Sequence, residues 1–369
     1  MSEKIGVGII GANPDRGWAL TAHLPALAAL PQYELRAVGT SRRETADAAA
    51  AKFGALLAFA NYAELVRHPD IDLVTVSVKV PNHREIVLAA LEAGKHVYCE
   101  WPLGNGLAEA VEMADLARRK NVHAVIGLQG RVSPWINRIR DLVAGGYVGQ
   151  VLSTSVVVSG EVFGESIESA NAYLFERRNG ANLLTVMVGH FADTLCFCLG
   201  EFQALTAITA TQRATVTIRE TGDRVPVTVP DQIALSGSLV SGATASLHMR
   251  GGHSRGANLF WEINGTEGDL QITADMGFVH FRELTLQGGR GEETGLSPLT
   301  VGDEYRWAPD TLRGPAFNVA QLYVQLARDI REGTNCCADF DAAVVRHRML
   351  DAIQASADTG TRQGYQTDL

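Results

Sequence analysis

Short apolar runs alternate with helix-like segments along the first 130 residues of the chain. The runs have the length of strands and fall at residues 5–10, 35–39, 73–78, 96–99 and 124–128. The segments between them carry apolar residues at helical spacing, for example over 86–93 and 108–119. Continuous apolar strands that alternate with helices are typical of a parallel sheet covered on both faces. We therefore predict a Rossmann-type, doubly wound α/β domain over residues 1–130.

After residue 150 the pattern changes to alternating apolar and polar positions. β-branched segments of this kind lie at 152–158, 204–211, 233–239, 243–249 and 259–263. Such segments are typical of antiparallel strands with one buried face. A loop and an apolar helix interrupt the pattern up to residue 199, and two helical segments close the chain. We predict an α+β substrate and oligomerisation domain with a large open antiparallel sheet over residues 131–369, and its C-terminal helices are candidates to pack back on the first domain.

The first apolar run ends in a glycine-bearing turn, which leads into a helical segment up to Leu30. Strand, glycine turn, helix and strand form the unit that places a pyrophosphate on a helix N-terminus. The turn departs from the G-x-G-x-x-G pattern, because Asn13 replaces the middle glycine and the loop is longer. Asn tolerates left-handed backbone better than most residues, so the turn still suits this task. We predict dinucleotide contacts from Gly11, Ala12, Asn13, Arg16, Gly17 and Trp18.

The second strand ends in Thr40-Ser41-Arg42-Arg43, where a protein that binds NAD usually carries Asp or Glu. A carboxylate at this point accepts hydrogen bonds from the ribose 2′-hydroxyl, whereas a hydroxyl and two guanidinium groups suit a 2′-phosphate. We therefore predict that Ser41, Arg42 and Arg43 contact the coenzyme, and we favour NADP(H) over NAD(H). The alternative is an ordinary strand–helix loop whose arginines lie on the surface.

Composition and charge narrow the classes of partner. The chain has 369 residues and a net charge of −9, and nucleic-acid binding relies on clustered Lys and Arg, so we expect no nucleic-acid partner. The most apolar stretch is interrupted by His190 and Asp193 and no leader precedes the first strand, which predicts a cytoplasmic protein without a membrane partner. The five cysteines fit a reducing compartment and lack ligand spacing, so we expect no metal site. The uncovered face of the open sheet predicts a homo-oligomer.

Several motifs at the later strand ends and in the second domain resemble one family. They are Pro81-Asn82-His83, the run Glu92-Ala93-Gly94-Lys95-His96-Val97, the turn Glu100-Trp101-Pro102, and the glycine-bearing segments 146–149 and 265–270. Together they resemble the glucose–fructose oxidoreductase, inositol dehydrogenase and rhizopine-catabolism (Gfo/Idh/MocA) family over nearly the whole chain. Within that family, residues 17–18, 100–103, 128–131 and 229–231 are most similar to the branch of the fungal galactose-regulon repressor.

The resemblance implies hydride transfer between a nicotinamide coenzyme and a sugar, cyclitol or related cyclic small-molecule substrate. It also implies coenzyme contacts at the later strand ends, from Val80, Asn82, His83, Glu100, Trp101, Pro102 and Gln129. Family enzymes commonly carry Lys where this chain has Trp101, and Asp where it has Val186, four residues before His190. These two departures weaken the case for ordinary alcohol dehydrogenation.

Hydride transfer to a carbonyl carbon needs a nearby acid, because an alkoxide is not released unprotonated into an apolar pocket. The resemblance makes His190 the principal candidate, since its helix faces the coenzyme in the family; the alternative is a buried histidine with a structural role. Lys79 ends a strand at the carboxyl edge and can replace the missing lysine, or else lie in solvent. Substrate contacts are expected from Arg131, Tyr173 and Asp193.

Two functions therefore remain open from the sequence. The first is an NADP(H)-dependent oxidoreductase in which His190 is the acid or base and Lys79 assists. The second is a non-catalytic NAD(P)-binding regulatory protein that resembles the galactose-regulon repressor and acts through protein contacts, because the acidic chain carries no DNA-binding motif. We favour the enzyme, because hydride transfer to a conjugated or activated carbon allows solvent to deliver the proton.

Overall fold

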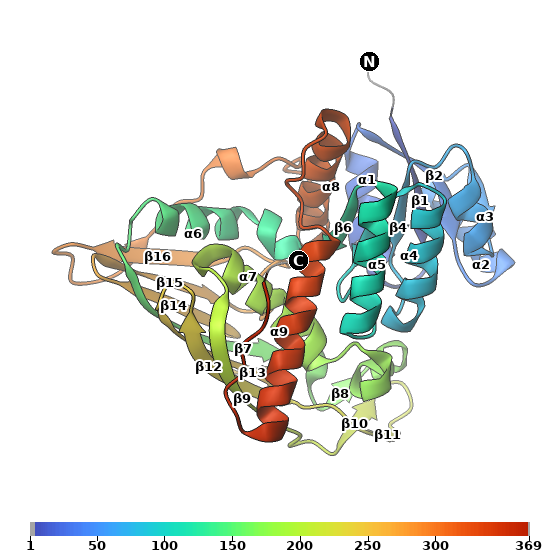
Figure 1. Ribbon diagram of the computed structural model, residues 1–369. Helices are drawn as coiled ribbons and strands as arrows, with labels where there is room; N and C mark the ends of the chain where they lie inside the picture. Colours follow the sequence, from blue (N-terminus) through green and yellow to red (C-terminus); the bar gives the residue numbers. More distant parts are fainter. Residues whose placement is uncertain (1–3, 368–369) are drawn as a thin grey trace. The chain divides into compact units, whose positions relative to one another are not determined.

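The computed structural model describes residues 4–367 and is drawn in Figure 1. It divides the chain into two units. The first unit runs to Gln129 and also includes Arg306–Val344, whereas the second comprises Gly130–Tyr305 and the residues from Val345 onward. The alternation of strands with helices thus belongs to the first unit, and a segment near the C-terminus returns to it.

The first unit is built on a six-stranded sheet in the order β3-β2-β1-β4-β5-β6. Every neighbouring pair in it is parallel. Strands β1, β4 and β6 are buried along their whole length, as expected for a sheet with helices on both faces. The predicted Rossmann-type fold is confirmed. The strands are β1 (Ile5–Ile10), β2 (Tyr33–Gly39), β3 (Leu57–Phe59), β4 (Leu73–Val76), β5 (His96–Glu100) and β6 (Ala124–Gly127).

Helices connect these strands. The helix expected after the glycine turn begins as a π-helical turn, η1, and continues as α1. No helix within residues 4–367 is long and apolar enough to cross a membrane. The helical segments of this unit are η1 (Ala19–His23), α1 (Leu24–Ala29), α2 (Arg43–Phe53), α3 (Tyr62–Arg67), η2 (Val80–Asn82), α4 (His83–Glu92), α5 (Leu107–Lys120) and α8 (Pro315–Glu332), together with the start of α9 (Phe340–Thr359).

The strand order reverses between β1 and β4, and ligands of doubly wound sheets bind at the carboxyl ends of the strands at such a point. Gly11 follows β1 there and has φ +100°. A Cβ atom on Gly11 would lie 2.1 Å from the carbonyl oxygen of Ser77. Only glycine allows the chain after β1 to pass this close to the chain after β4.

The second unit is built on an eight-stranded sheet in the order β17-β16-β15-β14-β7-β13-β12-β9. Neighbouring strands are antiparallel, except that β7 and β13 run parallel. The expected large open sheet is confirmed, and its one parallel pair is a feature that alternation does not reveal, because both pairings share a period of two. The strands are β7 (Val151–Gly160), β9 (Phe202–Ala210), β12 (Gln232–Leu239), β13 (Thr244–Gly251), β14 (Leu259–Gly265), β15 (Gly268–Ala274), β16 (Thr285–Arg290) and β17 (Ser297–Pro298).

Smaller elements complete the second unit. A three-stranded sheet has the order β11-β10-β8 and was not anticipated from the sequence. Its strands are β8 (Ser166–Ile167), β10 (Thr215–Ile218) and β11 (Arg224–Pro226). The helical segments are η3 (Gln129–Val132, which begins in the first unit), α6 (Pro134–Ala144), η4 (Glu161–Phe163), η5 (Ser169–Phe175), η6 (Arg177–Asn179), η7 (Leu183–Val188), α7 (Gly189–Leu199), η8 (Asp303–Tyr305) and the rest of α9.

The eight-stranded sheet has one apolar face and one polar face. Val156, Leu235 and Leu247 are buried on the inner face, and α7 packs there through Phe191, whose ring lies 5.6 Å from that of Trp261. The opposite face carries short polar side chains such as Ser155, Ser236 and Thr244, which are exposed. Ile208 on this face is 72% exposed. The polar face therefore carries an exposed apolar side chain on its edge strand β9.

A buried cluster of charges ties α9 to α7 within the second unit. Arg346 on α9 is fully buried, and its guanidinium lies 2.7 Å from Glu201 and 3.5 Å from Asp193. Arg131 binds the same Asp193 at 2.6 Å. Burial alone would raise the pKa of Asp193, but the charges of Arg131 and Arg346 hold it below its usual value. The cluster is therefore ionised, and each carboxylate has a cation beside it.

Replacement of Arg346 tests how much this cluster contributes to the stability of the fold. Arg346→Met should lower the free energy of unfolding in urea by about 3–5 kcal/mol, because Glu201 and Asp193 lose a buried cation. The matched control is Arg328→Met, which removes an exposed pair with Glu332 and should cost less than about 1 kcal/mol. Equal losses in the two variants would show that the buried cluster contributes no more than a surface pair.

Candidate functional site

The glycine turn lies at the carboxyl end of β1, as the pattern predicted, and it is folded by its own polar groups. The side-chain oxygen of Asn13 accepts a hydrogen bond from the backbone N–H of Asp15 at 2.9 Å. Gly17 has φ +98° with open space where a Cβ would point. Ala12 is buried and Arg16 is exposed. The loop thus presents backbone to the outside without a side chain at Gly17 in the way.

The arginines at the end of β2 differ in their surroundings. The guanidinium of Arg43 donates to Asp47 at 3.0 Å and to the carbonyl of Ala58 at 3.3 Å. Arg42 lies at the N-cap of α2 in an extended conformation. Within residues 4–367 its exposed side chain has no hydrogen-bond or ion-pair partner. Ser41 beside it is exposed as well. Of the two arginines at the end of β2, Arg42 is therefore the one that offers an uncommitted guanidinium to an anion.

Glu100, at the end of β5, is surrounded by hydrogen-bond donors. Its carboxylate accepts hydrogen bonds from the amide of Gln129 at 2.9 and 3.0 Å and from the indole of Trp18. His23 lies 2.9 Å away, and the Glu100 side chain is 13% exposed. Burial by itself would raise the pKa of Glu100, but the hydrogen bonds from His23, Gln129 and Trp18 lower it. Three residues predicted to contact the coenzyme are thus brought together, and Gln129 is fully buried behind the carboxylate.

His23 extends this network into the interior. Its Nδ1 lies 2.9 Å from the hydroxyl of Tyr323, which lies 2.9 Å from the hydroxyl of Thr75. Neither His23 nor Tyr323 was expected from the sequence to have a role. The available signal was a histidine on the apolar face of the helix after the glycine turn, and Tyr323 is 300 residues further along the chain.

The loops after β4 and β5 are joined by His83. Its buried ring bonds the carbonyls of Val78 at 3.0 Å and Pro102 at 2.9 Å, and burial lowers its pKa. The Trp101–Pro102 peptide bond is cis, and Trp101 is 5% exposed. Beyond β4, Val80 is buried, while Lys79 and Asn82 are exposed. The geometry therefore gives His83 a supporting position beneath the turn that carries Trp101.

In the second unit, His190 of α7 lies against a second histidine that sequence reasoning missed. The ring of His280, from the connection between β15 and β16, is 4.4 Å from that of His190 at an interplanar angle of 33°. His190 is 9% exposed and His280 is 2% exposed. Burial and the neighbouring His190 lower the pKa of His280 well below its usual value. His280 is therefore neutral, and no pattern in its connecting segment distinguished it.

The expected substrate residues lie in different surroundings. Both carboxylate oxygens of Asp193 accept hydrogen bonds from the guanidinium of Arg131, at 2.6 and 2.9 Å. Asp193 therefore fixes the position of that guanidinium. Arg131 keeps 24% of its side chain exposed. Tyr173 in η5 is partly buried, and burial raises its pKa. Among residues 4–367 no group of three His, Cys, Asp or Glu side chains is arranged to hold a metal ion.

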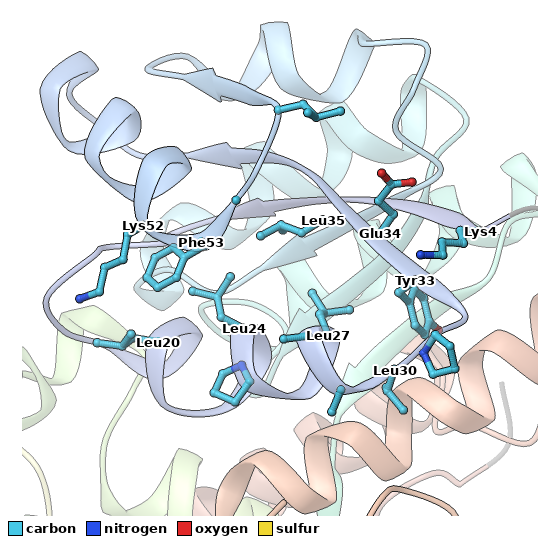
Figure 2. A pocket seen from close by; sticks show the side chains of 16 residues that line it. Lys4, Leu20, Leu24, Leu27, Leu30, Tyr33, Glu34, Leu35, Lys52 and Phe53 are labelled. Atoms are coloured by element: carbon cyan, nitrogen blue, oxygen red, sulfur yellow. The ribbon is translucent and has the colours of Figure 1, made fainter.

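The first unit also has a pocket of about 700 Å³, away from the candidate coenzyme site. Figure 2 shows that apolar side chains of α1, such as Leu24 and Leu27, line it opposite Phe53 of α2. Tyr33 and Leu35 contribute from the first residues of β2. Because Gly11 and Arg42 follow the carboxyl ends of their strands, this pocket is distinct from the candidate coenzyme site.

Comparisons with known proteins match both units. Residues 5–128 match the model of the oxidoreductase family with an NAD-binding Rossmann fold, and residues 134–274 match that of the C-terminal domain of Gal80p. "Dehydrogenase aclE" of Aspergillus oryzae is 31% identical over 100% of both chains. The galactose/lactose metabolism regulatory protein GAL80 of Saccharomyces cerevisiae is 30% identical over 76% of this chain and 69% of its own.

Two further similarities agree with these matches. The levoglucosan dehydrogenase of Pseudarthrobacter phenanthrenivorans is 27% identical over 73% of each chain. The crystal structure of a super-repressor mutant of Gal80p from Saccharomyces cerevisiae has a TM-score of 0.89 at 25% identity and covers 98% of both chains. The chain therefore belongs to the Gfo/Idh/MocA oxidoreductase family, near its Gal80 branch, and its first unit is an NAD-binding Rossmann domain.

Proposed function

We propose that the chain is an NADP(H)-dependent oxidoreductase that transfers hydride to or from a sugar, cyclitol or related cyclic substrate. The observation that carries the coenzyme preference is the uncommitted guanidinium of Arg42 beside the hydroxyl of Ser41, at the carboxyl end of β2. A 2′-phosphate offers this guanidinium charge-assisted hydrogen bonds, whereas a 2′-hydroxyl gives it no anion.

The glycine turn fits a dinucleotide. Gly11 lets the chain after β1 pass close to the carbonyl of Ser77, and Gly17 has open space where a Cβ would point, so the turn presents backbone to a ligand. In this placement the adenosine half lies over β1 and β2, where Arg42 is, and the nicotinamide half lies over β4 to β6. Lys79, Glu100 and Trp101 belong to that second half, and His83 and Gln129 support it from within. The bound coenzyme would supply or accept the hydride.

A side chain of the protein must transfer the proton that accompanies the hydride. His190 is our proposed acid or base, because a neutral imidazole accepts a proton from a carbinol and an imidazolium donates one to a carbonyl oxygen. Arg131 and Tyr173 are proposed to contact the substrate, with Asp193 fixing the guanidinium of Arg131 from behind. Lys79 is proposed to assist. A relative named as a dehydrogenase aligns over the full length of this chain and favours an enzyme. Another is named as a levoglucosan dehydrogenase and favours a sugar or related cyclic substrate.

A specific observation also favours a second function. Residues 134–274 match the C-terminal domain of Gal80p, and the chain carries Trp101 and Val186 where family enzymes commonly carry Lys and Asp. A coenzyme-binding regulator in the cytoplasm that acts through protein contacts is therefore the alternative. Such a regulator would also need coenzyme binding by the first unit, but it would not need His190 as an acid or base.

We further propose a homo-oligomer formed through the polar face of the eight-stranded sheet. Short polar side chains are exposed on that face, and Ile208 on its edge strand β9 is 72% exposed. An exposed sheet face is a surface through which two identical chains can form a two-fold contact.

Charge removal at the end of β2 tests the coenzyme preference. Arg42→Gln should raise the Kd of NADPH by about 10–100-fold and leave that of NADH nearly unchanged, because only NADPH presents a phosphate. Arg43→Gln is the matched control and should have a smaller effect, since Arg43 is held by Asp47 and Ala58. Equal losses of affinity for NADPH and NADH in fluorescence titrations would show that the arginines have a structural role and do not contact the 2′-phosphate.

Removal of the imidazole tests the proposed chemistry. NADPH absorbance is followed with a panel of keto-sugars, inososes and enones, and the best acceptor is then used with His190→Asn. We expect kcat to fall by about 10²–10⁴-fold with an unchanged Kd for coenzyme, because a general acid or base contributes by that factor. A wild-type chain that binds NADPH and turns over none of the panel would instead support the regulator.

A charge on the polar face tests the oligomer. In analytical ultracentrifugation the wild-type chain should sediment as a dimer or larger species, and Ile208→Glu should shift it towards the monomer, because a buried carboxylate at the contact lacks a partner. Leu56→Glu, at a similarly exposed leucine of the first unit, should leave the sedimentation unchanged. A monomeric wild-type chain would contradict the proposal.

A further inference from the structure

The pocket of the first unit has no part in the proposed function. Its volume of about 700 Å³ is typical of small-molecule sites, which range over about 300–1,000 Å³. Figure 2 shows that its walls come from η1 and α1, from the first part of β2 and from the end of α2. These elements all belong to the first unit. The pocket is therefore formed within a single unit.

Apolar side chains form most of the walls of this pocket. Leu20, Leu35 and Phe53 are half-buried, and Leu56 is 69% exposed. Apolar surface of this kind remains in contact with water, and its burial by an apolar ligand is favourable. The lining therefore suits a ligand whose body is apolar.

The charged residues of the pocket are distributed unevenly. They are Lys4, Glu34 and Lys52. Figure 2 shows Lys52 at one end, near Leu20 and Phe53, and both Lys4 and Glu34 at the other end. Among the lining residues, which all fall within 4–367, the end at Lys52 has no carboxylate. One end of the pocket thus carries a single positive charge, and the other end carries both signs.

The ammonium of Lys52 is held in position at its end of the pocket. It donates a hydrogen bond to the carbonyl of Pro14 at 2.5 Å and lies 5.8 Å from the centre of the Phe53 ring. Within residues 4–367 no further hydrogen bond engages this ammonium, which has three N–H donors. Because the long side chain is already ordered, an anion that binds it incurs a smaller loss of entropy.

We propose that this pocket binds a small apolar molecule with a single carboxylate, of the class of medium-chain fatty acids. The carboxylate contacts Lys52, and the alkyl chain lies along Leu24, Leu27 and Leu35 towards the opposite end. One ammonium suits a singly charged head, whereas phosphate groups favour arginine forks or helix N-termini. The site goes beyond the proposed function, and its occupation does not require the coenzyme.

Calorimetry of the purified chain with hexanoate, octanoate, decanoate, 1-octanol and octylammonium tests the class of ligand. We expect one decanoate per chain with a Kd below about 1 mM. Each added methylene should lower the Kd by about three- to fourfold, because it is buried against apolar walls. 1-Octanol should bind about fivefold more weakly than octanoate, and octylammonium more weakly still, because neither offers Lys52 a negative charge.

Variants test where the ligand lies. Lys52→Met removes the charge but keeps a long side chain, so the Kd of octanoate should rise by about fivefold while that of 1-octanol stays unchanged. The matched control is Lys4→Met, at the other end of the same pocket, which should leave both Kd values unchanged. Leu35→Gln should raise the Kd of every ligand by at least about fivefold, because it places an amide in the apolar wall. Circular dichroism checks that each variant is folded.

The proposal would be overturned by the absence of saturable decanoate binding, by equal affinities for octanoate and 1-octanol, or by equal losses in Lys52→Met and Lys4→Met. A Kd that rises with the concentration of the chain would overturn it as well, because a second copy would then occupy the pocket. Saturating NADPH should leave decanoate bound, and displacement would assign the fatty acid to the coenzyme site instead. A chain that binds decanoate but neither coenzyme would overturn the proposed function alone.

Discussion

A carboxylate in a protein interior needs polar partners, and Glu100 finds them, directly or through His23, in three parts of the first unit. Trp18 precedes η1, His23 ends it, Gln129 follows β6, and Tyr323 of α8 reaches the carboxylate through His23. The glycine turn, the carboxyl ends of the central strands and the segment that returns near the C-terminus are therefore held by one negative charge. Removal of any donor would leave a buried charge less compensated, which costs more than the loss of an ordinary hydrogen bond.

This constraint also explains why the same edge of the sheet suits a coenzyme. Gly11 brings the chain after β1 close to the chain after β4, and His83 joins the loops after β4 and β5. The edge is thus rigid beneath the surface, while Arg42, Ser41 and Lys79 remain exposed on it. A supported backbone with exposed cationic side chains suits a phosphate-bearing ligand. In the second unit the buried Arg346 cluster holds α7, which carries His190, in a comparable way.

The sequence predicted the parts of this arrangement that follow from local pattern. Five strands of the parallel sheet, the open second sheet and the turn after β1 are encoded in periodicity and glycine placement, whereas the short edge strand β3 was not predicted. The partners of the buried charges were beyond such reasoning, because His23 meets Tyr323 across 300 residues and Arg346 meets Glu201 across 145. The sequence treated Arg42 and Arg43 alike, and only the positions of Asp47 and Ala58 distinguish them. His280 was missed because it lies in an irregular connection, and the parallel pairing of β7 with β13 because alternation is the same in both directions.

Family membership does not distinguish an enzyme from a regulator, because relatives named as a dehydrogenase and as a regulatory protein both align with this chain. Both functions require that a dinucleotide bind to the first unit, and we propose that its 2′-phosphate lies at Arg42. Calorimetry of the purified, ligand-stripped chain with NADPH and with NADH tests this requirement most directly. The account predicts heat with both and a Kd for NADPH lower by at least about tenfold, the effect of one charge-assisted contact. The absence of heat with either coenzyme, or a preference for NADH, would contradict it.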